Sequence, residues 1–114
     1  MERIVEQTLL YDFYGELLNE HQRQIYTEAV FNDYSLSEIA DEYGISRQGV
    51  HDLIKRVDKT LTEYEEKLHL IEKFIATKEK VHLIDWYAND YISSSDIDCI
   101  HKIQDIAKEI IEDF

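Results

Sequence analysis

Few residues in this sequence combine the type and the spacing that enzymatic chemistry requires. Glu66 and His69 form a Glu-x-x-His pair, but a carboxylate-bridged di-iron site needs two such pairs and two further glutamates. Cys99 is the single cysteine, and its place at the start of a predicted helix favours a partly buried structural thiol over a nucleophile. The three glycines do not form a phosphate-binding loop. We therefore expect no enzyme, no metal site and no cofactor.

The clearest pattern lies between residues 36 and 55. A short helix there would end at Gly44, and a second would begin after Ser46, whose hydroxyl can accept a hydrogen bond from a free amide of the first turn. Ala40 is small, as the close crossing of two helices demands. The spacing is that of a helix-turn-helix. We expect the space between its helices to be filled by Ile39, Tyr43, Ile45, Val50 and Leu53.

The outward side chains of the second helix could read DNA. Arginine and glutamine recognise guanine and adenine edges in the major groove, and the first turn of a recognition helix is where such contacts arise. Asp52 lies on the same side and opposes them. The candidate DNA-binding residues are Ser46, Arg47, Gln48, His51, Lys55 and Arg56.

The charge of the chain opposes binding to nucleic acid. The sequence has 12 basic and 25 acidic side chains and a formal net charge of −13. Only residues 35–57, with three basic and four acidic side chains, approach neutrality. Phosphate contacts supply much of the affinity for DNA, and few cations are available here. The acidic excess fits either solubility or a surface for a basic protein partner.

Helices must carry these residues, because the chain has no proline and few glycines. We predict an all-α protein without a membrane span and without a secretory signal, which indicates a cytoplasmic location. Helices are expected over 4–18, over 20–31 after an Asn19/Gln22 capping box, and over 36–43 after a Ser35/Glu38 capping box. A further helix should begin at 47, and helical structure should continue to about Asn89, followed by a loop over residues 93–95. A last helix should follow a Ser95/Asp98 capping box.

Apolar side chains follow a regular four-three spacing from Val50 to Ile75. One helix over 47–75, or two nearly collinear helices with a bend near Thr60 or Thr62, would carry this seam. It is longer than the first domain can cover, so the C-terminal segment or a second chain must cover it. We expect a helix-turn-helix domain at 1–57, a helical extension at 58–114 that packs on the long helix, and a homodimer. The candidate dimer or packing seam is Leu61, Tyr64, Leu68, Ile71 and Ile75.

The chain resembles the YlxM family of small bacterial helix-turn-helix proteins over about residues 8–75. The resemblance depends on LYDFY at 10–14, LL at 17–18, QR at 22–23, DYSLSEIADE at 33–42, SRQ at 46–48, IKR at 54–56 and YEEKL at 64–68. The helix-turn-helix part is also similar to region 4 of bacterial sigma factors. Gly49, His51 and Leu53 depart from the residues typical of many relatives, which bears on any shared DNA-sequence preference.

The resemblance implies an all-α fold and a regulatory role in the signal recognition particle pathway, beside whose GTPase the family is typically encoded. It implies action by binding that GTPase or by controlling expression. Two functions therefore stay open. The first is a non-enzymatic regulatory protein that acts by protein–protein interaction, and the alternative is a DNA-binding transcriptional regulator that uses the helix at 47–57. Trp86, Tyr87 and Tyr91 could pack on the seam or anchor a partner.

Overall fold

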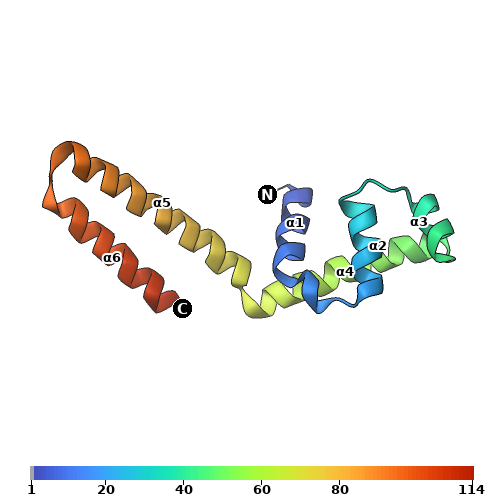
Figure 1. Cartoon of the computed structure of the whole chain (residues 1–114). Helices are drawn as coiled ribbons and strands as arrows, with labels where there is room; N and C mark the ends of the chain where they lie inside the picture. Colours follow the sequence, from blue (N-terminus) through green and yellow to red (C-terminus); the bar gives the residue numbers. More distant parts are fainter. Residues whose placement is uncertain (1) are drawn as a thin grey trace. The chain divides into compact units, whose positions relative to one another are not determined.

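The computed structural model describes residues 2–114, and these form six α-helices, one short 3-10 helix and no strand (Figure 1). The all-α fold class is thus confirmed. The elements are α1 (Arg3–Tyr14), η1 (Gly15–Leu17), α2 (Glu20–Val30), α3 (Leu36–Tyr43), α4 (Arg47–Leu68), α5 (Leu70–Ser94) and α6 (Ile97–Asp113). None of these helices is long and apolar enough to cross a membrane.

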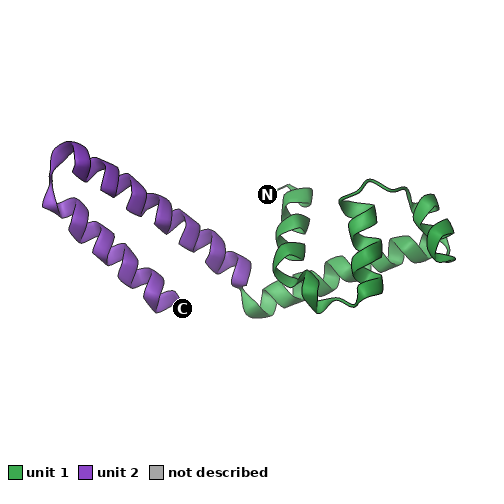
Figure 2. Cartoon of the chain, in the orientation of Figure 1, with its two compact units in different colours: residues 1–69 green, residues 70–114 purple. Residues whose placement is uncertain are grey.

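The chain divides into two compact units, residues 1–69 and residues 70–114 (Figure 2). The sequence suggested a division at 57/58 instead. Residues 58–68 belong to the first unit because Asp58, Leu61 and Glu65 contact the helices before the helix-turn-helix: Leu61 is fully buried, and the two carboxylates accept hydrogen bonds from α1 and α2.

Local hydrogen bonds begin the helices of unit 1 where the sequence places them. The side chain of Asn19 accepts a bond from the Gln22 amide, and the Gln22 side chain accepts one from the Asn19 amide. Ser35 and Glu38 form the same reciprocal pair before α3. The two capping boxes predicted for unit 1 are confirmed.

The helix-turn-helix consists of α3, the turn and the first part of α4. Gly44 ends α3 in the left-handed conformation, with φ of +67°, which glycine adopts without the steric cost of a Cβ. The Ser46 hydroxyl accepts a hydrogen bond of 2.9 Å from the Gly49 amide and thereby caps α4. The core between these helices contains Ile25, Ile39, Ala40 and Val50, with Ala29, Leu36, Tyr43, Leu53 and Ile54 packed around it.

The helices α1, α2 and α3 all pack along α4 (Figure 1). Two buried tyrosines fasten α1 and α2 to its second half. The Tyr14 hydroxyl donates to Glu65 Oε1, and the Tyr26 hydroxyl donates to Asp58 Oδ1, each over 2.5 Å. Asp58 also accepts a bond of 3.2 Å from Gln7 Nε2 of α1. Each buried hydroxyl is thus paired with a charged acceptor, as burial of a polar group requires.

The first helix is shorter than the sequence suggests. The prediction of a helix over 4–18 is wrong in its last turn, because α1 ends at Tyr14 and residues 15–17 tighten into η1. A Cβ on Gly15 would lie 2.9 Å from the ring of Tyr11. This close approach needs glycine, and it occurs where the helix changes its geometry.

The bend predicted near Thr60 or Thr62 is wrong. Helix α4 runs without interruption through both threonines, and the Thr62 hydroxyl donates to the carbonyl of Asp58 within the helix. A single helix over 47–75 does not form either, because His69 adopts a left-handed conformation with φ of +55° and ends α4. The four-three apolar spacing therefore continues from α4 into α5, although the helix is interrupted between them.

Unit 2 is a hairpin of α5 and α6, which pack side by side (Figure 1). The prediction that α5 ends near Asn89 is wrong. The hydroxyls of Ser93 and Ser94 donate to carbonyls four residues earlier, so these serines extend the helix instead of forming a loop. Ser95, with φ of +59°, makes the turn. Asp96, not Ser95, caps α6, by accepting a bond from the Asp98 amide.

Candidate functional site

The candidate DNA-binding residues lie on the exposed side of the first turns of α4. This helix turns Val50, Val57 and Leu61 into the core of unit 1, where they are fully buried. Because a helix presents opposite faces at successive half-turns, the polar side chains between them face solvent. The exposed set contains all the candidates: Ser46, Arg47, Gln48, His51, Lys55 and Arg56.

Three of these side chains line a shallow hollow at the start of the helix-turn-helix. Arg47, Gln48 and His51 form one wall, and Leu36 at the start of α3 forms the other. A hollow between the first turns of the two helices is where the backbone or a base of a duplex approaches in helix-turn-helix complexes. The capping role of Ser46 uses its hydroxyl as an acceptor for Gly49.

Asp52 occupies the middle of this face. Gln48 Nε2 donates a hydrogen bond of 2.9 Å to Asp52 Oδ1. His51 Nδ1 lies 3.7 Å from the same oxygen, which makes an ion pair when the imidazole is protonated. The glutamine amide, which could otherwise read adenine, is thus partly engaged by a carboxylate. The same carboxylate would repel an approaching phosphate.

Three cations on the face are free to bind a partner. Within the described part of the chain, Arg47, Lys55 and Arg56 make neither ion pairs nor side-chain hydrogen bonds. They can pair with DNA phosphates or with carboxylates of another protein. Three cations are few for a helix-turn-helix that must overcome a net charge of −13.

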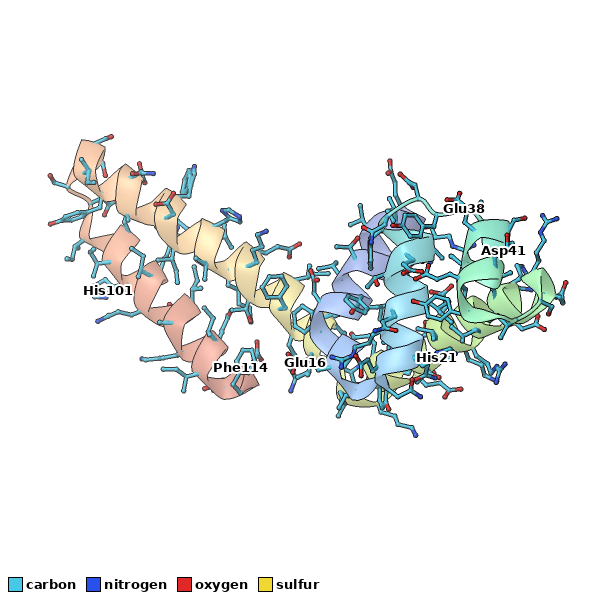
Figure 3. The ribbon with its side chains drawn as sticks, turned by 45° about the vertical axis from the view of Figure 1, so that its right-hand side comes forward. Glu16, His21, Glu38, Asp41, His101 and Phe114 are labelled. Carbon is cyan, nitrogen blue, oxygen red and sulfur yellow. The ribbon has the colours of Figure 1, made fainter. Side chains whose placement is uncertain are left out.

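Helix α3 carries several carboxylates. Glu38 and Asp41 are exposed on this helix (Figure 3). Glu42 lies close to Glu28 of α2, and desolvation together with this second carboxylate raises the pKa of Glu42 above its ordinary value. The Tyr43 hydroxyl donates to Glu28 Oε1 over 3.2 Å; desolvation and that contact raise the pKa of Tyr43. The helix-turn-helix therefore presents an acidic surface beside a small basic one.

The other residues that the sequence singled out for possible chemistry are Glu66, His69 and Cys99. Helix α4 ends before His69, so Glu66 and His69 do not share a helix face. Cys99 is buried and its thiol donates to Asp90 Oδ2 over 3.2 Å. Burial and Asp90 raise the pKa of the thiol, which disfavours the thiolate that a nucleophile needs. The described residues contain no cluster of three His, Cys, Asp or Glu that could hold a metal ion.

The candidate seam divides between the two units. Leu61 is fully buried in unit 1, and the Tyr64 ring lies 5.9 Å from that of Tyr14 in α1. Leu68, at the end of α4, is 48% exposed. Ile71 and Ile75 belong to α5. Sequence reasoning missed the contacts of Asp58, because its partners Gln7 and Tyr26 lie 51 and 32 residues away and no local pattern relates them.

Comparisons with known proteins agree with this geometry. The sequence model of a family described as "Putative helix-turn-helix protein, YlxM / p13 like" matches residues 1–106. A UPF0122 protein of Acetivibrio thermocellus is 41% identical over 98% of this chain and 99% of the relative. One from Caldanaerobacter subterraneus is 51% identical over 68% of this chain and 66% of the relative. One from Desulforamulus reducens is 39% identical over 91% of this chain and 89% of the relative. The chain therefore belongs to the YlxM / p13-like family of helix-turn-helix proteins.

Proposed function

We propose that this chain is a non-enzymatic regulatory protein of the cytoplasm that acts by binding a basic partner protein, and that this partner is the GTPase of the signal recognition particle. One observation carries the choice of a protein partner. The carboxylate of Asp52 lies within the face that would read DNA and engages Gln48 there. Two further exposed carboxylates, those of Glu38 and Asp41, lie on α3 of the same helix-turn-helix.

Long-range electrostatics supports a basic partner. A chain with a net charge of −13 attracts a positively charged surface and speeds the encounter, whereas it repels a nucleic acid. The choice of this particular GTPase follows from the resemblance to the YlxM family. The three unpaired cations of α4 would then meet carboxylates of the partner and fix its orientation.

The test is a calorimetric titration of the full chain with the purified GTPase. The variant Asp41→Asn/Asp52→Asn removes two charges from the surface beside α4. The control variant Asp12→Asn/Glu16→Gln removes two exposed charges from α1 and η1, and Glu16 lies away from Asp41 in Figure 3. We expect at least about a tenfold loss of affinity for the first variant only. Equal affinities for both variants, or no binding by the unaltered chain, would contradict the proposal.

A second function is favoured by the free cations. Arg47, Lys55 and Arg56 stand at the positions where a recognition helix meets a duplex, and no described residue neutralises them. The alternative is thus a DNA-binding transcriptional regulator that uses the first turns of α4. Fluorescence anisotropy with mixed-sequence duplex at about 50 and 200 mM salt tests it, because phosphate-driven affinity falls steeply over this range.

We also propose that the chain acts as a homodimer. Support comes from the apolar positions that remain accessible at the end of α4 and along unit 2, including Leu68 at 48% exposed and Trp86 at 59% exposed. Large exposed apolar side chains in such number are typical of interaction surfaces. Light scattering after size-exclusion chromatography measures the mass, and a mass equal to the 13.6 kDa of one chain at all concentrations would refute the dimer.

A further inference from the structure

Both helices of unit 2 carry their own heptad spacing. On α5, positions 70, 74, 77, 81, 84, 88 and 91 are apolar or threonine, at alternating steps of four and three. On α6, positions 100, 103, 107, 110 and 114 are apolar at the same steps. Such spacing makes a continuous apolar stripe along a helix. The stripe on α5 is only partly covered, because Phe74 and Val81 remain 43% and 51% exposed.

The two edges of the hairpin differ in chemistry. On one edge, Lys80 Nζ lies 2.7 Å from Asp113 Oδ2 and 3.8 Å from Glu109 Oε2. On the same edge, Lys102 Nζ lies 5.2 Å from the centre of the Tyr87 ring. These contacts bridge α5 and α6 and satisfy the charges there. This polar edge needs no further partner.

The opposite edge is apolar. Helical periodicity places Val81, Ala88 and Ile92 of α5 beside Ile100, Ala107 and Ile111 of α6, and we call these six residues the apolar edge. On α5, Lys78 and Asp85 flank Val81 on the same side of the helix, three residues before it and four residues after it. Val81 is 51%, Ile92 78% and Ile111 74% exposed. The side chains of the apolar edge therefore remain open to solvent in the single chain.

Unit 2 buries too little to be stable as an isolated hairpin. Among its apolar side chains, only Ile71 and Cys99 are classed as buried in the described chain. A helical hairpin of this size lacks the core that an independent fold requires. Two more helices laid on the apolar edge would complete a four-helix bundle, in which every helix turns its heptad stripe inward.

Charge complementarity favours a second copy as the occupant of this edge. Two chains of the same high negative charge need an interface whose own charges pair, and Lys78 and Asp85 carry opposite charges on either side of Val81. With antiparallel α5 helices centred near Val81, Lys78 of each copy would face Asp85 of the other.

We infer that the apolar edge is a homodimer interface at which the hairpins of two copies close a four-helix bundle. The inference rests on the homodimer proposed above and not on the identity of the partner protein. It assigns the interface to unit 2 instead of the exposed end of α4. The dimer would then carry two copies of unit 1, and therefore two copies of the same binding surface.

The variant Val81→Glu/Ile111→Glu tests the interface, because it places charges at two exposed positions of the apolar edge. The control His82→Glu/His101→Glu adds the same two charges to exposed positions of the same helices, outside this edge. Light scattering and sedimentation velocity from about 1 to 100 μM measure the mass, and mass action sets the range. We expect a dimer for the unaltered chain and the control, and a monomer for Val81→Glu/Ile111→Glu.

A second variant, Ile92→Glu, guards against loss of fold, because a side chain that is 78% exposed contributes little packing within the chain. We expect it to weaken the dimer at least about tenfold, with circular dichroism showing that unit 1 stays helical. A dimer that withstands all the apolar-edge variants as well as the control would overturn this interface but leave the homodimer. A monomer for the unaltered chain at about 100 μM would overturn both.

Discussion

At the scale of single residues, Asp58 connects α4 to the helices before it in unit 1. Its carboxylate accepts hydrogen bonds from Tyr26 of α2 and Gln7 of α1, and Arg3 lies 3.4 Å away. It therefore joins three helices at one point. Burial, followed by the bond to Asp58, raises the pKa of Tyr26 far above its ordinary value of 10.0. The phenol stays protonated because an ionised Tyr26 would face a carboxylate in a buried site.

The variant Tyr26→Phe is expected to lower the free energy of unfolding by about 1.5–3 kcal/mol, the usual contribution of a hydrogen bond to a charged group. Tyr34→Phe, at a tyrosine that is 46% exposed, is the control and should change it by less than about 0.5 kcal/mol. Urea denaturation followed by circular dichroism measures both. Equal stabilities for the two variants would show that the Tyr26–Asp58 bond adds nothing.

The pH dependence of stability follows from the same tyrosine. Above pH 10.0 the phenol ionises in the unfolded chain but not in the folded one, so the unfolded state binds fewer protons and folding stability falls as the pH rises. Below that pH the contribution of Tyr26 is fully present. Urea denaturation at pH 9 to 11, about one unit either side of the phenol pKa, measures the free energy of unfolding. Over this range the free energy of unfolding should fall less steeply with pH for Tyr26→Phe than for the unaltered chain. Parallel pH dependences would contradict this assignment.

The candidate DNA-binding residues make a further prediction at the scale of single residues. Arg47→Ala removes the free guanidinium of the recognition turn, and we expect it to abolish most DNA binding if the alternative function holds, since such contacts contribute about 1–3 kcal/mol. Asp52→Asn should strengthen DNA binding, because it removes the carboxylate from the reading face. Anisotropy titrations measure both changes. An Arg47→Ala variant that binds duplex with unchanged affinity would show that α4 is not the reading helix.

At the scale of elements, four described positions turn the chain by adopting positive φ. Gly44 does so without strain, whereas Asp33, His69 and Ser95 are L-residues at +57°, +55° and +59°. An L-residue in this region costs roughly 1 kcal/mol. At Ser95 the turn is shaped by backbone contacts, because its amide donates to the carbonyl of Tyr91 over 2.7 Å. The side chain of Ser95 is therefore dispensable.

Ser95→Gly should stabilise the hairpin, because glycine keeps the backbone bond to Tyr91 without the cost of a Cβ. We expect a gain of about 0.5–1 kcal/mol in the free energy of unfolding, reduced by the greater entropy of the unfolded chain. Ser93→Gly, two residues earlier and within α5, is the matched control and should cost about 0.5–1 kcal/mol instead. Thermal denaturation measures the two. A loss of stability at both positions would contradict the strain at Ser95.

At the scale of the whole molecule, the two units differ in how much they bury. Unit 1 contains the fully buried side chains Ile25, Ile39, Val50, Val57 and Leu61. Each such side chain contributes roughly 1.5–3 kcal/mol relative to solvent exposure. Unit 2 exposes apolar side chains on both helices. The division suggests a folded binding unit joined to a hairpin whose stability depends on an interface.

A fragment of residues 1–69 is therefore expected to fold by itself. It should be helical and unfold in urea in one cooperative transition, as single small domains do. A fragment of residues 70–114 should show helicity that rises with concentration, because its apolar side chains need a second copy. Circular dichroism over a dilution series measures both. A broad, non-cooperative transition for residues 1–69 would mean that unit 1 needs the rest of the chain.

The sequence alone determined the helix starts and the turn of the helix-turn-helix. Asn19, Ser35 and Ser46 cap helices by hydrogen bonds to residues three positions away, and Gly44 is the residue that a left-handed turn favours. These are local interactions, so the residue types nearby suffice to predict them. The exposure of Arg47 and its neighbours followed from the same periodicity.

The tertiary structure decided where the long seam breaks and what the seam contacts. The break falls at His69 and not at Thr60 or Thr62, and α1 and α2 pack on the uninterrupted part of α4 before it. No local signal marks His69, since neither glycine nor proline stands there. The same holds for Asp58, whose partners come from α1 and α2. Contacts between residues far apart depend on the packing of whole helices, which local spacing does not encode.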